Sequence, residues 1–181
     1  MKNVYLRPLS LADSDRTWKW HNDPALYDRL VTPFRFVSRL SEEEWLRKKM
    51  AYSQSEMQLA ICLRENDAHI GNIHLRHIDW VSHNAETGIF IGEEAHRGRG
   101  YGEQAMRLML LHSFKDLGLQ RIWLTVFDDN PAAIRSYEKC GFTVEGKLRK
   151  HALKHGRLKD LLYMAVNIDD PGAAWVRGEG A

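Results

Sequence analysis

Apolar and polar positions along the chain first predict a short strand and two helices. The apolar run at 4–6 predicts a strand that ends near Pro8, because proline has no N–H to donate to a strand ladder. At 10–21, a serine followed by acidic residues predicts a helix with an N-cap and an acidic first turn. Ser41 and Glu44 have the spacing of a capping box, which predicts that a second helix begins there.

After the second helix the pattern changes to extended apolar runs. The runs at 59–63, 69–75 and 88–91 are separated by short polar turns, which predicts three strands of an antiparallel meander. The run at 121–127 is apolar on both faces, as expected for a central strand that helices cover on each side.

The remaining pattern predicts two more helices and a hairpin. Apolar residues recur at helical spacing over 102–117, and a further helix is expected at 130–140. Extended runs at 142–148 and 158–168 flank a short turn that contains glycine, which predicts a hairpin. Strands and helices thus alternate through the second half of the chain.

Length and composition agree with a single α/β domain that has a mixed α+β sheet. The 181 residues leave room for one core, so we expect one domain at 1–168 and a flexible tail, rich in Gly and Ala, at 169–181. Lys and Arg total 26 against 24 Asp and Glu, a net charge of +2 that implies no nucleic-acid partner. Two cysteines, no signal-like start and no membrane-length apolar stretch predict a cytoplasmic protein without a membrane partner.

The segment at 89–102 leads from a strand through a glycine-rich turn directly into a helix. Its glycines let backbone N–H groups converge beside the N-terminus of the helix, which adds unsatisfied donors and partial positive charge. Arg97 and Arg99 add full charges. The spacing of Gly98, Gly100 and Gly102 fits neither the dinucleotide fingerprint nor the triphosphatase loop. The segment predicts a phosphate site of another kind, and a turn that merely connects two elements is the alternative.

A second motif follows the strand at 121–127. Arg97, Gly100 and Gly102 match the Arg/Gln-x-x-Gly-x-Gly/Ala pyrophosphate signature of the GNAT acetyltransferases. The Asn-x-x-Ala-x-x-x-Tyr-x-x-x-Gly-Phe signature of the same family is matched by Asn130, Ala133, Tyr137, Gly141 and Phe142. The chain resembles the GNAT superfamily, in the branch of the spermidine and ribosomal-protein alanine N-acetyltransferases.

The resemblance implies a fold and a cosubstrate. It implies the GNAT fold, a mostly antiparallel sheet of about six to seven strands with one splayed parallel pair, flanked by about four helices. Acetyl-CoA is expected between the splayed strands, 88–91 and 122–127, with no metal required. The residues that the resemblance assigns to the coenzyme are Phe90, Ile91, Arg97, Gly98, Arg99, Gly100, Tyr101, Gly102, Asn130 and Ala133.

The implied reaction is direct attack of a primary amine on the thioester in a ternary complex. A backbone N–H near Phe90 or Ile91 would hold the negative charge that develops on the carbonyl oxygen. Glu86 is the candidate general base, with a solvated edge-strand carboxylate as the alternative reading. The resemblance makes Tyr137 the general acid for the departing thiolate, and its spacing from Asn130 puts both on one helix face.

The histidines and Cys140 do not predict a further chemical site. His69, His74 and His77 lack a completing ligand set, so we expect no metal site. Cys140 has no histidine partner at a recognisable spacing, so a buried structural thiol is expected.

The sequence does not determine which amine accepts the acetyl group. A polyamine, a protein N-terminus, an amino sugar and an aminoglycoside are all compatible, and so is a non-catalytic acyl-CoA-binding module. The resemblance leaves a homodimer open. Residues 21–50 are expected to form much of the acceptor pocket, but their acidic and basic side chains nearly balance, without the carboxylate excess that a polyamine site favours.

Overall fold

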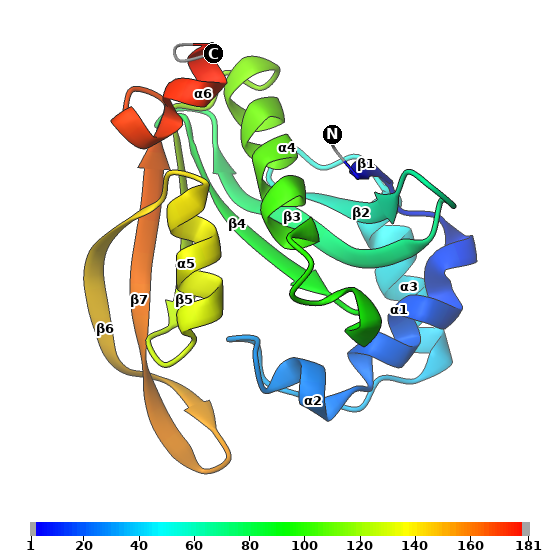
Figure 1. Ribbon diagram of the computed structural model, residues 1–181. Coiled ribbons are helices and arrows are strands. Elements are labelled where there is room, and N and C mark those ends of the chain that lie inside the picture. The colour runs from blue at the N-terminus through cyan, green and yellow to red at the C-terminus, as the bar shows by residue number, and fades with distance from the viewer. Residues whose placement is uncertain (1–2, 179–181) are drawn as a thin grey trace.

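The computed structural model describes residues 3–178, which form a seven-stranded sheet with helices on both faces (Figure 1). The strands are β1 (Val4–Pro8), β2 (Met57–Leu63), β3 (His69–Asp79), β4 (Asn84–Ile91), β5 (Arg121–Phe127), β6 (Thr143–Lys154) and β7 (Arg157–Asn167). The helices are α1 (Ser14–His21), α2 (Pro24–Tyr27), α3 (Arg39–Met50), α4 (Tyr101–Lys115), α5 (Pro131–Lys139) and α6 (Ala174–Arg177). Short 3-10 turns are η1 (Leu11–Asp13), η2 (Glu94–His96) and η3 (Pro171–Ala173).

The strand order is β1-β2-β3-β4-β5-β7-β6. Every neighbouring pair is antiparallel except β4 and β5, which are parallel. The predicted meander of β2, β3 and β4, the central position of β5 and the C-terminal hairpin of β6 and β7 are therefore confirmed. The mixed α/β fold with one parallel pair is confirmed as well.

The alternation of side chains along the strands divides the core between the two faces of the sheet. In β2, Ile61 and Leu63 belong to the main core cluster, whose other members include buried residues of α4. Ala60 and Cys62 point the other way and pack with Leu46 of α3. Helices α4 and α5 therefore cover one face, and α3 covers the opposite face.

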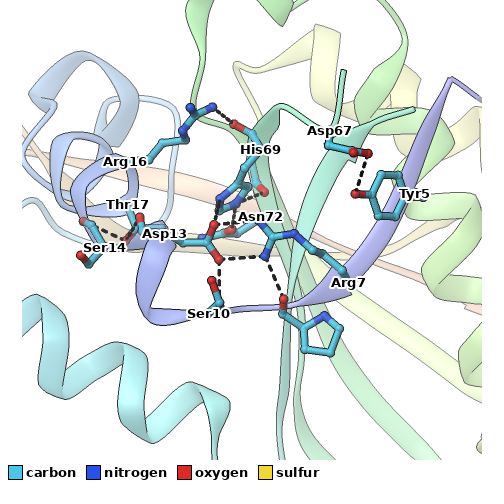
Figure 2. A network of polar contacts seen from close by, with 12 residues as sticks. Tyr5, Arg7, Ser10, Asp13, Ser14, Arg16, Thr17, Asp67, His69 and Asn72 are labelled. Carbon is cyan, nitrogen blue, oxygen red and sulfur yellow. Dashed lines mark hydrogen bonds and ion pairs between the residues drawn. The ribbon is translucent and has the colours of Figure 1, made fainter. Parts of the chain in front are cut away.

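A buried polar network joins the first helix to the sheet (Figure 2). Arg7 donates two hydrogen bonds to the carboxylate of Asp13, at 2.8 and 2.7 Å. Asp13 also lies 3.1 Å from Nδ1 of His69, whose Nε2 lies 2.8 Å from Oδ1 of Asn72 on β3. Burial opposes ionisation of Asp13, but hydrogen bonds from Arg7 and from the Ser10 N–H lower its pKa to about 2. The network holds α1 in a defined position against β3.

Helix α3 begins earlier than the sequence predicts. Ser38 has extended backbone angles and its Oγ accepts a hydrogen bond from the N–H of Ser41 at 3.1 Å, so Ser38 is the N-cap. The predicted cap residue, Ser41, lies inside the first turn. The expectation that Ser41 caps the helix is wrong because serines at 38 and 41 offer competing caps, and the chain enters the helix at the first of them.

The chain after Asn167 also departs from expectation. Residues 171–177 form η3 and α6, and Ala173 and Val176 are buried in the main core cluster. Gly172 lies so close to Gly141 that a Cβ on Gly141 would be 2.5 Å from the Gly172 carbonyl oxygen. The expectation of a loose tail is wrong as far as residue 178, because this contact and the two apolar side chains attach the segment to the core. Residues 179–181 of the expected tail lie outside the described residues.

Within residues 3–178, no helix is long and apolar enough to cross a lipid bilayer.

Candidate active site

A groove opens where β4 and β5 separate. The two strands pair only over Asn84–Glu86, opposite Arg121–Trp123, and then diverge. The groove has a volume of about 650 Å³ and extends from this point to the N-terminus of α4. We call the end formed by the 97–102 turn and α5 the turn half. The other end, the strand half, is lined by His21, Arg29, Trp45, Lys49, Gln58, His74, Arg76 and Glu86.

Most residues that the sequence predicts for the site lie together along this groove. Those that line it are Glu86, Phe90, Ile91, Arg97, Gly98, Gly100, Tyr101, Gly102, Asn130, Ala133 and Tyr137. Arg99 is exposed and does not line the groove in the described chain. Its charge can act there only through solvent, where screening weakens it.

The turn before α4 has the backbone geometry of an anion site. Gly98 and Gly100 have φ values of 72° and 78°, and a Cβ on either would meet nothing within 4 Å. Glycine is therefore required there by the left-handed backbone and not by lack of space. Gly100 is the N-cap of α4, whose first-turn N–H groups have no acceptor within the helix. These donors and the helix dipole favour a negatively charged ligand.

Arg97 is oriented differently from the prediction. Its Nε donates to the carbonyl of Ile91 at 3.0 Å, and a terminal guanidinium nitrogen donates to the carbonyl of Gly92 at 2.7 Å. Asp23 lies 3.8 Å from the same guanidinium. Arg97 therefore holds the turn against the end of β4, which leaves fewer of its donors for a ligand.

Trp20 of α1 packs against the end of β4 just before the turn, a contact that the sequence did not predict. Its ring meets Phe90 edge-on at 5.9 Å between centroids, and a Cβ on Gly92 would lie 2.2 Å from it. Its Nε1 donates to Glu93 at 3.3 Å. Trp20 thereby connects α1 to the end of β4 and the start of the turn.

Asn130 and Tyr137 lie on one side of the groove. The side-chain oxygen of Asn130 accepts a hydrogen bond from the N–H of Ala133 at 3.2 Å and caps α5. Tyr137 follows two turns later and packs its ring against Phe142. Burial raises the pKa of Tyr137 to about 12, so its hydroxyl keeps its proton at neutral pH.

A family model described as an acetyltransferase (GNAT) domain matches residues 3–143. The chain belongs to the GNAT acetyltransferases. It is therefore an acyltransferase, and the family that its two motifs indicate is confirmed.

Relatives of this GNAT protein are N-acetyltransferases with different named acceptors. An L-amino acid N-acetyltransferase of Escherichia coli K12 is 30% identical over 165 residues, 91% of this chain and 98% of the relative. A spermidine N(1)-acetyltransferase of Vibrio cholerae is 36% identical over 97 residues, 54% of this chain and 56% of the relative. The crystal structure of a Vibrio cholerae spermidine N-acetyltransferase in complex with CoA and spermine superposes with a TM-score of 0.85 at 26% identity, covering 92% of this chain and 96% of that one.

Glu86 is neither a free base nor a solvated edge carboxylate in this GNAT protein. Its two oxygens lie 2.9 Å from Arg76 and 2.9 Å from Nδ1 of His77. Its strand lies inside the sheet, and its side chain is 13% exposed. The alternative reading of an edge-strand side chain is wrong, and the role of Glu86 as the base stays a prediction.

His74 is a buried polar residue of the strand half for which the sequence predicted no role. Its ring lies over Gly88 of β4, where a Cβ would be 2.6 Å from Nε2. That nitrogen is buried and has no hydrogen-bond partner among residues 3–178. Burial, together with the charges of Arg76 and Lys49, lowers the pKa of His74 to about 3. Polar residues at alternate positions of an otherwise apolar strand, Asn72, His74 and Arg76, are the signal in the sequence that could have identified this face.

Two further expectations concern the histidines and Cys140. His69 belongs to the network of Asp13, and His77 to that of Glu86. In the described part of the chain no three His, Cys, Asp or Glu side chains form a group that could hold a metal ion. Cys140 is fully buried, and burial raises its pKa to about 12, which makes it a poor nucleophile and agrees with a structural thiol.

Proposed function

We propose that the protein transfers the acetyl group of acetyl-CoA to a primary amine. One observation carries the proposal: the anion-binding turn, the diverging strands and Tyr137 all line a single groove. The crystal structure of the Vibrio cholerae relative contains CoA and spermine, which supports a coenzyme and an amine as the two ligands.

The turn half would bind the coenzyme. Backbone N–H groups at 98–102 and the N-terminus of α4 would donate to the pyrophosphate, and Arg97 holds the turn against the end of β4. The pantetheine arm would lie between β4 and β5, beside Asn130 and Ala133. Beyond Glu86 the ladder to β5 ends, so β4 backbone groups are available there, and an N–H near Phe90 or Ile91 would stabilise the oxyanion.

The strand half would bind the amine. An ammonium first gives one proton to water or to Glu86, and the free nitrogen attacks the thioester carbon. The new C–N bond forms, the C–S bond breaks, and the nitrogen gives up its second proton as the amide forms. Tyr137, protonated at neutral pH, donates to the departing sulfur and regains a proton from the one that the nitrogen gives up, so the products are an amide, a thiol and one proton in solution.

The identity of the amine is a separate question. The relatives are named for spermidine and for L-amino acids, so their names support an amine without selecting one. A small amine or a protein N-terminus remains our first proposal, and an amino sugar or aminoglycoside the second. A homodimer and a cytoplasmic location remain expectations of the same kind.

Calorimetry with acetyl-CoA and release of free thiol in the presence of amines test the proposal. We expect heat of binding and thiol release that depends on both substrates. Binding without thiol release from any amine would instead support a non-catalytic acyl-CoA-binding module. Absence of binding at millimolar acetyl-CoA would refute the proposal.

A further inference from the structure

Basic side chains outnumber acidic ones in the lining of the strand half of the groove. Its lining contains Arg29, Lys49 and Arg76 but one carboxylate, Glu86. Lys49 pairs with Glu56, which lies outside the lining. Arg76 pairs with Glu86, so Arg29 is the basic side chain of this lining that has no ion pair among residues 3–178. This charge favours an acceptor with an anionic group over a polyamine, which carries several positive charges.

Two buried polar atoms of this half have no hydrogen-bond partner in the described chain. They are Nε2 of His74 and Nε of Arg76, on residues that share one face of β3. Buried polar atoms in proteins are almost always paired, so such atoms on a groove wall indicate where a ligand binds. The neutral ring of His74 offers a lone pair at Nε2 in its Nδ1–H tautomer, while the Nε of Arg76 offers a proton.

Arg76 is oriented by a second contact. One of its terminal nitrogens donates to Glu86 at 2.9 Å, and Glu86 is held in turn by His77. The guanidinium side chain is 41% exposed, so a ligand in the groove can reach it. In this arrangement Glu86 positions Arg76, and the guanidinium keeps unused donors for an anion.

The strand half therefore presents a hydrogen-bond acceptor on His74 and a donor on Arg76, two residues apart on one face of β3. We propose that the amine substrate is an α-amino acid, whose amino group donates to Nε2 of His74 and whose carboxylate accepts from Arg76. This inference rests on the proposed acetyl transfer and specifies the substrate class of the same site.

The test compares substrates with and without a free carboxylate beside the amine. Thiol release from acetyl-CoA is measured with pools of protein L-amino acids, and the best amino acid is then compared with its decarboxylated amine, its amide, a short peptide and spermidine. We expect kcat/KM to fall about tenfold to 100-fold when the carboxylate is removed, because a charged hydrogen bond is lost and Arg76 is left unpaired. Spermidine should be a poorer substrate than the amino acid.

Substitution of Arg76 gives an independent readout. Arg76→Gln should lower kcat/KM for the amino acid about tenfold, and the ratio between amino acid and decarboxylated amine should approach one, because the selecting contact is gone. Arg47→Gln removes the same charge from an exposed position on α3 outside the groove and should leave the ratio unchanged. The substrate ratio of the unmodified protein tests the proposal even if the Arg76 variant fails to fold.

The outcomes separate this inference from the proposed function. If acetyl-CoA binds and spermidine, the peptide or the decarboxylated amine is acetylated as well as the amino acid or better, the inference is wrong while acetyl transfer stands. If acetyl-CoA binds and no amine is acetylated, both the inference and the transfer reaction are wrong. If acetyl-CoA does not bind, the proposed function fails first, and calorimetry reports that failure directly.

Discussion

The imidazole of His74 lies over the backbone of Gly88, on the strand where the parallel pair begins to separate. A Cβ on Gly88 would lie 2.6 Å from both Cε1 and Nε2 of the ring. The absence of a side chain at residue 88 thus allows a buried histidine to face the groove. The β3–β4 register makes His74 and Gly88 direct partners.

Gly88→Ala should displace the His74 ring without unfolding the protein, because the ring is the movable end of a side chain and can rotate away. We expect kcat/KM for the amine to fall about tenfold, since the lost contact is a single hydrogen bond. Acetyl-CoA affinity, measured by calorimetry, should change much less. Gly146→Ala is the matched control, because a Cβ there meets nothing within 4 Å. Equal activity of both variants would remove His74 from the acceptor site.

Gly100→Ala should weaken acetyl-CoA binding. The left-handed backbone at Gly100, with φ 78°, costs a residue with a Cβ about 1–2 kcal/mol, and the turn would shift to relieve it. Gly118→Ala imposes a similar strain at φ 67°, outside the groove lining. Both variants should lose comparable thermal stability, whereas only Gly100→Ala should raise the Kd for acetyl-CoA. A similar Kd for both would mean that the turn does not bind the coenzyme.

Tyr137→Phe should lower turnover on the order of 10²-fold, because the departing sulfur loses its proton donor. The phenylalanine ring can keep the contact with Phe142, so folding and acetyl-CoA binding should persist. Tyr52→Phe, at a side chain that is 91% exposed, is the control. Steady-state thiol release together with calorimetry checks the prediction, and a variant with full turnover would exclude Tyr137 from the reaction.

His74 should make the fold sensitive to acid. Its pKa is about 3 in the folded protein and 6.5 for an unperturbed histidine, so between these values the unfolded chain binds more protons. Stability therefore falls as the pH drops below 6.5, by at most about 1.4 kcal/mol per pH unit from this residue. His69, whose pKa is also lowered by burial, acts in the same direction.

Urea unfolding between pH 7 and pH 4.5 measures this effect. The free energy of unfolding of His74→Gln should fall less steeply with decreasing pH than that of the unmodified protein. His151→Gln replaces an exposed histidine and should keep the original slope. Identical slopes for all three proteins would mean that His74 is not buried as a neutral ring.

The amino-acid sequence by itself determined the order of the elements and both family motifs. Glycines with left-handed angles at 98 and 100 and the asparagine cap at 130 are properties of short segments, because backbone dihedrals and helix caps depend on neighbouring residues. The C-terminal helix α6 escaped prediction because its own pattern is weak and the segment before it packs against Gly141, about 30 residues away along the chain.

The tertiary structure decided which side chains are available for chemistry. The fold determines whether Arg97 faces a ligand or the carbonyls of β4. It also determines whether Glu86 is free or paired with Arg76, because the fold sets the relative positions of the segments that carry them. The period of two in a strand assigns a residue to a face, but strand register selects its partner, and register is set by packing of the whole sheet. That is why His74 could be noticed in the sequence and its position over Gly88 could not.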